Sequence, residues 1–319
     1  MKLVQTLVVR DEIDVVESQI AYHLNAGVDC VIATDHESVD GTTDVLERYE
    51  RDGRLRLIRE SGPVREHEWR TRMARLAAAE HGAEWVINTD ADEFWMPRRG
   101  MLKDALAAIP APYGVVWATS RHFVPRPDDG APFFERMTVR FSSPAALNDP
   151  LSPYRPHAKA AHRGDPNVIV RHGSHRVETS FEPLPHWHPF DVLHFPFRSL
   201  EQYARKTARR GRPDADSRLG QYVRGLHARE AGRVHEVYGA TVVDDAELER
   251  GLASGSLVLD MRLRDALRAG SGPEADGDPS EVAVDAAALR EAEIVRLLRF
   301  ATDLRARLER VERRRWARR

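Results

Sequence analysis

The sequence has little cysteine and no long hydrophobic run, and these absences exclude several classes of protein. Its 319 residues contain one cysteine, Cys30, so no disulfide can form within the chain. Cys30 stands in an apolar stretch, where a buried and unreactive thiol is expected. No apolar run approaches the roughly 20 residues of a membrane-spanning helix. The apolar N-terminus, residues 1–9, is short and lacks a cleavage region, so we expect a first strand and a cytoplasmic protein.

The chain also lacks an excess of one charge. Its formal net charge is −2 at pH 7, although 31% of its residues are charged, so nothing global favours nucleic acid as a partner. Arginine greatly outnumbers lysine, a bias typical of GC-rich bacterial genomes. An apolar content of 42% can supply a core for one large domain with an appendage.

Residues 2–95 alternate between strand and helix patterns. Strands are expected at residues 3–9, 29–34, 55–58 and 83–88, and helices at 14–25, 42–50 and 68–81. This order predicts an α/β fold with a doubly wound, mostly parallel sheet. The carboxyl ends of such strands form one edge, where ligands bind.

The pattern changes after residue 95. Further strands are expected at residues 114–118, 137–141 and 168–170. A Pro- and Asp-rich stretch at 142–166 is typical of a long functional loop. Ser199 can cap a helix that begins at Leu200, with Gln202 in the capping-box position.

These patterns divide the chain into four parts. Residues 1–211 are expected to form the main domain, with a first half at 1–95 and a second half at 96–211. A helical extension at 212–269 and a linker at 270–280 follow. Residues 281–319 read as an amphipathic helix whose apolar seam, 294–311, suits a homodimer or the protein's own core. Its arginine-rich end suits solvent, with peripheral contact to an anionic membrane as the alternative.

A cluster of carboxylates follows the fourth expected strand. Asp90, Asp92 and Glu93 stand almost side by side after the apolar residues Val86 and Ile87. Neighbouring carboxylates repel one another unless a cation neutralises them. Hard cations such as Mg²⁺ or Mn²⁺ prefer carboxylate oxygens and are often shared with a substrate phosphate. The cluster therefore favours a metal-bridged phosphate ligand over an acidic loop that faces water.

Several motifs in a fixed order resemble those of glycosyltransferase family 2-like proteins. The motifs are Arg10-Asp11-Glu12, Tyr22-His23-Leu24, Gly27-Val28-Asp29, residues 34–42 with Asp35, Ser38 and Asp40, residues 90–94, and residues 194–199. The resemblance covers about residues 3–210. It implies a GT-A fold with a helical C-terminal extension, in which residues 1–211 would form the catalytic domain, with a nucleotide-binding half at 1–95 and an acceptor-binding half at 96–211. Asp11 replaces the more usual Asn before Glu12.

The resemblance also implies a nucleotide-sugar donor, with a UDP-sugar expected, and a hydroxyl acceptor. Asp35 would contact the base or ribose of the donor, and Arg10, Glu12 and Asp40 lie at the same edge. Arg65, Arg70 and Arg72 precede the metal strand and could meet a pyrophosphate; of these we select Arg72. Each of the three could equally form a solvated helix face.

The metal would be bound by Asp92 directly, while Asp90 would act through ribose or water. A late histidine is the third ligand in similar proteins, and His194 fits better than its rivals His172 and His175. The reaction, an inverting transfer, requires a general base on the acceptor hydroxyl.

The candidates for that base are Asp149, Glu178 and Asp191, from which we select Glu178 and then Asp191. A nucleotidyltransferase and a non-catalytic scaffold are the alternative classes. A nucleotidyltransferase should carry a Gly-rich loop after the first strand, but Arg10-Asp11-Glu12 holds no glycine.

Overall fold

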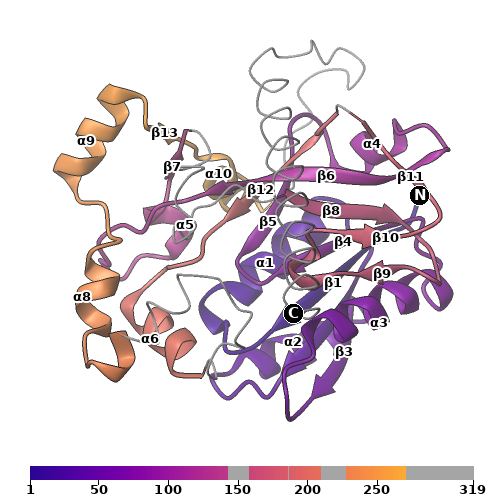
Figure 1. The fold of residues 1–319 in the computed structure, drawn as a ribbon, viewed down its shortest axis with the longest axis horizontal. Helices are drawn as coiled ribbons and strands as arrows, with labels where there is room; N and C mark the ends of the chain where they lie inside the picture. Colours follow the sequence, from indigo (N-terminus) through magenta and orange to yellow (C-terminus); the bar gives the residue numbers. More distant parts are fainter. Residues whose placement is uncertain (143–157, 186, 210–227, 271–319) are drawn as a thin grey trace, which may run out of the picture.

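The computed structural model describes residues 1–142, 158–185, 187–209 and 228–270. Its centre is a curled nine-stranded sheet with helices on both faces (Figure 1). The strand order is β3-β2-β1-β4-β8-β6-β12-β5, with β11 beside β6. Because seven of these nine strands run in one direction, the mixed, mostly parallel α/β class is confirmed.

The first half follows the expected alternation. Its elements are β1 (Leu3–Val9), α1 (Ile13–Asn25), β2 (Cys30–His36), α2 (Thr42–Arg51), β3 (Leu55–Glu60), α3 (Glu66–Ala79) and β4 (Trp85–Asp90). In the parallel register Val9 lies opposite Asp35, and Val8 lies opposite Asp90. The carboxyl ends of β1, β2 and β4 therefore meet at one edge, as the alternation predicts.

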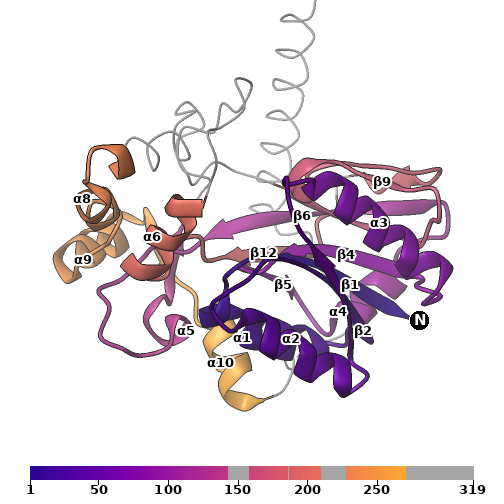
Figure 2. The same cartoon turned by 90° about the horizontal axis from the view of Figure 1, so that it is seen from below.

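Strand β5 (Glu93–Pro97) shows why the sheet must curl. Only Ala91 and Asp92 separate it from β4, yet it pairs with β12 at the far end of the strand order. Four strand spacings are about 19 Å, whereas this link spans about 11 Å. The second half of the sheet therefore folds back over the first, and α1 packs on both β5 and α2 (Figure 2). The sequence patterns did not predict β5.

The second half is built mainly from short strands. Its elements are α4 (Leu102–Ala107), β6 (Tyr113–His122), α5 (Phe133–Arg136), β7 (Val139–Phe141), β8 (Ala158–Arg163), β9 (Ile169–Val170), the 3₁₀ turn η1 (His172–Ser174), β10 (Val177–Glu178), β11 (Glu182–Pro183) and β12 (Phe190–His194). β8 corrects the expected loop at 142–166, because it lies between β4 and β6. Lys159 and His162 make it look like a loop, but both side chains are buried.

The C-terminal extension shares the core of the domain. Helix α6 (Leu200–Arg209) ends the 1–211 domain, and the described part of the extension contains α8 (Val234–Gly239), α9 (Asp245–Ser254), β13 (Leu257–Leu259) and α10 (Arg262–Ala269). The expected cap of α6 is present, since the Gln202 N–H donates to Ser199 Oγ at 3.1 Å. β13 pairs with β7, and Leu263 joins the main apolar core. The extension is therefore not purely helical.

The expected linker beyond Gly270, the helix at 281–319 and the dimer seam at 294–311 lie outside the described residues. Within the described ranges, no helix combines the length and the apolar character that crossing a membrane requires. The four-part division of the chain stays a prediction.

Candidate functional site

Aromatic packing holds the acidic turn between β4 and β5 in position. Phe94 and Phe195 are fully buried, with ring centroids 5.7 Å apart in an edge-to-face contact. Phe195 also stacks on Phe123 at 4.3 Å. Such pairs contribute about 0.5–1.5 kcal/mol beyond their buried area. Because Phe94 and Phe195 follow the acidic turn and His194 in sequence, this packing sets the positions of both.

Asp90 is neutralised by two basic side chains. Arg70, fully buried on α3, forms an ion pair with Asp90 Oδ1, and Lys159 Nζ lies 2.8 Å from Asp90 Oδ2. Burial raises the pKa of Asp90, but the charges of Arg70 and Lys159 outweigh it and hold the pKa below its usual range. Lys159 also contacts Glu93 Oε1 at 2.8 Å. Burial raises the pKa of Glu93, which lies beneath the turn.

Asp92 faces a different set of groups. Lys206 Nζ lies 2.8 Å from its Oδ2, and His194 Nε2 lies 3.6 Å from its Oδ1. Burial alone would raise the pKa of Asp92, but the charges of Lys206 and His194 hold the pKa well below its usual range. The Phe195 N–H donates to the Asp92 carbonyl oxygen at 2.9 Å. Asp92 and His194 therefore converge, as expected from the sequence.

A second histidine orients His194. His122, at the end of β6, is buried, and its Nδ1 lies 2.9 Å from His194 Nδ1. One of these nitrogens must donate and the other accept. This contact engages His194 through Nδ1 and leaves Nε2 directed at Asp92. The sequence patterns did not single out His122, although it ends a strand at the same sheet edge.

Arg198 ties the first strand's loop to the turn. It is fully buried and donates to Asp14 Oδ2 at 2.7 Å, and it also forms an ion pair with Glu12. Lys206 lies 3.6 Å from Glu12 Oε1. Glu12 thus joins the same charged group, as its place after β1 predicts. We name this group the Asp92 cluster; it comprises Glu12, Asp14, Arg70, Asp90, Asp92, Glu93, Lys159, His194, Arg198 and Lys206.

The other donor-binding candidates hold the neighbouring loops together. Asp35 accepts from Ser38 Oγ at 2.5 Å and Thr43 Oγ1 at 2.6 Å. Asp40 accepts from Thr42 Oγ1 at 2.6 Å, and lies 3.6 Å from Arg205. These are the turn and cap contacts expected of a short Asp at a loop. Contact of Asp35 or Asp40 with a donor stays a prediction.

The loop after β1 has an unusual backbone. Asp11 has φ +53°, in the left-handed region, where Asn and Asp are the most tolerated residues apart from glycine. Its N–H donates to Ser38 Oγ at 2.9 Å, and its Oδ1 accepts from the Val39 N–H at 2.8 Å. Asp11 can therefore serve in place of Asn here. Arg10 lies beside this loop, 3.1 Å from His36 Nδ1.

The arginine that reaches the acidic turn is Arg70; the selected Arg72 does not reach it, and its contact with a donor stays a prediction. Arg72 is 44% exposed and pairs with Glu60. Residues two apart on a helix point about 200° apart, so a helix that directs Arg70 inward directs Arg72 outward. The hydrophobic periodicity of α3, with Trp69 and Met73 buried, is the signal that distinguishes the two.

Neither selected base lies in the Asp92 cluster. Glu178 is on β10, where both of its oxygens accept from Arg171 at 2.8 Å. Asp191 is buried among Arg98, Arg121 and Arg262, at 3.2, 3.0 and 3.1 Å. Because side chains alternate along a strand, Asp191 and His194 point to opposite faces of β12. Asp149 lies outside the described residues, so the base is not assigned.

The rival histidines belong to the region of η1, which packs against α3, β4 and β8 on the Asp90 side of the turn. His172 is 72% exposed and is 3.9 Å from Glu66. His175 Nδ1 is 3.0 Å from the Ala158 carbonyl, and burial lowers its pKa to about 3. Of the three candidate histidines, His194 is the one beside Asp92.

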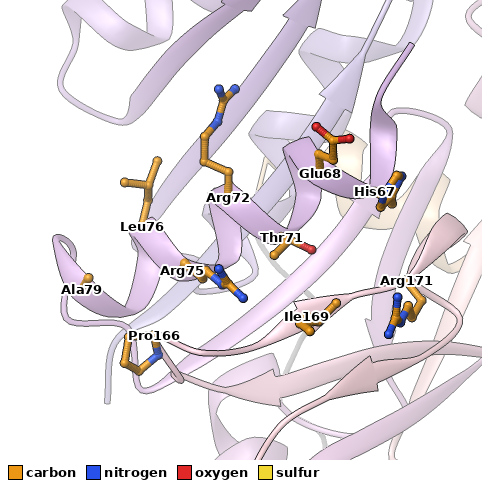
Figure 3. Close-up of a pocket in the computed structure, with 10 residues that line it drawn as sticks. All are labelled: His67, Glu68, Thr71, Arg72, Arg75, Leu76, Ala79, Pro166, Ile169 and Arg171. Atoms are coloured by element: carbon orange, nitrogen blue, oxygen red, sulfur yellow. The ribbon is translucent and has the colours of Figure 1, made fainter.

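A surface pocket of about 560 Å³ lies between α3 and β9 (Figure 3). It is lined by His67, Glu68, Thr71, Arg72, Arg75, Leu76, Ala79, Pro166, Ile169 and Arg171. Arg72 and Arg171 are already paired with carboxylates. This lining includes no member of the Asp92 cluster, so the pocket is separate from the acidic turn.

The donor atoms at the turn suit a divalent cation in part. Among the described residues, no group of three metal-ligating side chains converges. Asp92 Oδ1 and His194 Nε2 converge as a pair, while Arg70 and Lys159 occupy Asp90. Mg²⁺ is often held by one or two protein ligands together with substrate phosphates. The pair therefore fits a metal that a diphosphate would help to coordinate.

Comparison with known sequences identifies the class of enzyme. Residues 4–115 match the model of glycosyltransferase family 92, and on this match the chain is an enzyme of the glycosyltransferase class. The matched region contains β1 to β4, the acidic turn and β5. No curated protein gives a significant match.

Solved structures resemble the chain weakly. The S. aureus TarS 1–349 complex with UDP is 15% identical, with a TM-score of 0.33 over 88% of this chain and 95% of that one. Glucosyl-3-phosphoglycerate synthase from Mycobacterium tuberculosis is 21% identical, with a TM-score of 0.27 over 51% of this chain and 56% of that one.

Proposed function

We propose that the protein transfers a sugar from a nucleoside-diphosphate sugar to a hydroxyl acceptor, with a divalent metal and inversion at the transferred carbon. The observation that carries this is the approach of Asp92 Oδ1 and His194 Nε2 to 3.6 Å. They meet at the carboxyl edge of the parallel strands, where α/β sheets bind ligands, within a chain of the glycosyltransferase class.

Asp92 and His194 would hold the metal, Mn²⁺ or Mg²⁺. When bound, the ion would supply Lewis-acid stabilisation of the charge that develops on the leaving diphosphate. His122 orients His194 for this role, in the way that outer groups commonly fix a ligating imidazole. Asp90, held by Arg70 and Lys159, keeps a fixed carboxylate beside the ion.

Binding calorimetry with UDP tests the proposal. UDP should bind in the presence of Mn²⁺, and binding should vanish in excess chelator. His194→Gln should weaken or lose the Mn²⁺-dependent binding of UDP. His172→Gln, which changes an exposed histidine near Glu66, is the matched control and should keep it.

A thermal-shift screen of nucleotide sugars would then identify the donor, because a ligand that binds only the folded state raises its melting temperature. If no nucleoside diphosphate binds with or without metal, the chain does not bind such a donor and the proposal fails. Binding that survives chelation would refute the metal dependence alone.

A further inference from the structure

Lys206 differs from the other basic residues of the Asp92 cluster in its exposure to solvent. Its side chain is 22% exposed, whereas the Lys159 and Arg198 side chains are 3% and 1% exposed. It is one of only four lysines in a chain rich in arginine. A lysine ammonium is a point charge on a flexible stem, while arginine is suited to fixed, multiple hydrogen bonds. Lys206 can therefore change partners at lower cost than Arg198.

The present partners of Lys206 are groups that a metal would also contact. Its Nζ lies 2.8 Å from Asp92 Oδ2 and 3.6 Å from Glu12 Oε1. Asp92 Oδ1, the other oxygen of the same carboxylate, faces His194 Nε2. A divalent cation on Asp92 would repel the ammonium at this distance. Lys206 and the metal would then compete for one carboxylate.

A diphosphate resolves this competition. Its oxygens bring negative charge to the same place, and an ammonium forms strong charge-assisted hydrogen bonds with phosphate oxygens. On these grounds we propose that Lys206 is a diphosphate-binding residue that occupies Asp92 until the metal and the donor arrive. The inference rests on the proposed function and adds to it a residue that stabilises the leaving group.

The exchange predicts two effects of opposite sign for Lys206→Gln. Removing the ammonium removes a competitor, so Mn²⁺ alone should bind the free enzyme about 3- to 10-fold more tightly. Removing a phosphate partner should weaken UDP binding at saturating Mn²⁺ by about 10-fold or more, as expected for a charge-assisted hydrogen bond. A residue with only a structural role would not move the two affinities in opposite directions.

Lys103→Gln is the matched control. Lys103 also pairs with one carboxylate, at 2.7 Å from Asp29 Oδ1, but it lies on α4 and outside the Asp92 cluster. This variant should bind Mn²⁺ and UDP as the wild type does. Lys206→Arg keeps the charge, so its Mn²⁺ affinity should stay near the wild-type value. If Lys206→Gln folds poorly, the Mn²⁺ and UDP affinities of Lys206→Arg can be measured in its place.

Calorimetric titration of the full-length protein with Mn²⁺, and then with UDP at saturating Mn²⁺, separates the outcomes. Opposite shifts in Lys206→Gln, absent from Lys103→Gln, support the exchange. An unchanged Mn²⁺ affinity, or an unchanged UDP affinity, would overturn it while leaving the proposed function intact. If the wild type binds neither ligand, the proposed function itself fails.

Discussion

Two charged clusters lie on opposite faces of β12 and differ in composition. On one face, the Asp92 cluster contains more carboxylates than basic side chains, and two of the basic residues are lysines. On the other face, Asp191 and Asp260 are surrounded by arginines alone. We name this second group the Asp191 cluster; its members are Arg98, Arg121, Arg140, Asp191, Asp260 and Arg262.

The difference in composition distinguishes a binding site, the Asp92 cluster, from a set of ion pairs that hold secondary-structure elements together, the Asp191 cluster. In the Asp191 cluster, Arg262 contacts both Asp191 and Asp260, and Arg140 contacts Asp260 at 2.7 Å. These pairs join β12, β7 and the start of α10. Planar, multiply bonded guanidinium groups suit such fixed contacts. The Asp92 cluster instead contains five carboxylates, a histidine and a partly exposed lysine, a composition that suits a site that admits a cation.

Neutralising one carboxylate in each cluster gives the largest expected effects. Asp92→Asn should lower turnover by about 10³-fold, as loss of a main electrostatic contact to a transition state does. Asp191→Asn should lower the free energy of unfolding by about 3 kcal/mol, the low end for a buried pair, since it leaves the buried Arg121 and the partly exposed Arg98 and Arg262 without their shared anion. Turnover assays and denaturant unfolding of both variants measure the two effects.

The comparison also fixes what each variant should preserve. Asp191→Asn should keep the wild-type affinity for UDP. Asp92→Asn should lower stability slightly without metal, because Lys206 and His194 attract this carboxylate; simple repulsion among the acidic residues would instead raise it. If Asp191→Asn abolished UDP binding while remaining folded, the assignment of the two clusters to different roles would be wrong.

Mild acid should affect the support of the acidic turn before it affects the Asp191 cluster. His23 Nε2 accepts from the Trp95 N–H at 3.1 Å, and its Nδ1 contacts the Gln19 carbonyl at 2.8 Å. This arrangement requires a neutral ring, and burial lowers the pKa of His23 from 6.5 to about 4. As the pH falls below 6.5, His23 is protonated in the unfolded chain but not in the folded protein. The free energy of unfolding that His23 contributes above pH 6.5 is therefore lost progressively between pH 6.5 and pH 4.

The expected loss from His23 is about 2 kcal/mol at pH 5. His23→Gln should reduce the slope of stability against pH by up to one proton between pH 6.5 and 4. His67→Gln changes an exposed histidine and should leave the slope unchanged. Arg262 and Arg140 hold the pKa of Asp260 at about 2, so protonation of Asp260 lowers the stability only below about pH 4. Equal slopes in His23→Gln and the wild type would contradict this account.

The smallest expected effect is that of Arg72→Ala. Its exposed pair with Glu60 contributes about 0–1 kcal/mol, and UDP affinity should not change. Arg70→Ala, in the same helix, should be clearly more destabilising because it leaves Asp90 with Lys159 alone inside the protein. Thermal unfolding and UDP titration of both variants provide the measurement. A loss of UDP affinity in Arg72→Ala alone would restore Arg72 as the donor-binding residue.

The sequence by itself determined the first half of the fold. Each of the strands β1, β2 and β3 is followed by a helix and then by another strand, so parallel pairing and the common carboxyl edge follow from local patterns. The common edge, inferred from the sequence alone, predicts that Glu12, Asp35, Asp90 and Asp92 lie in one region. His194 could be selected because it follows an apolar strand and precedes a capped helix.

Only the tertiary structure decided which cations meet these carboxylates. Lys159 reaches Asp90 from β8, a strand whose polar residues Lys159 and His162 are more typical of a loop. Lys206 reaches Asp92 from α6, more than 100 residues along the chain. Strand alternation turned Asp191 away from His194, and helical rotation turned Arg72 away from Asp90. Local patterns record the period of an element, whereas the partner of each face depends on how distant elements pack.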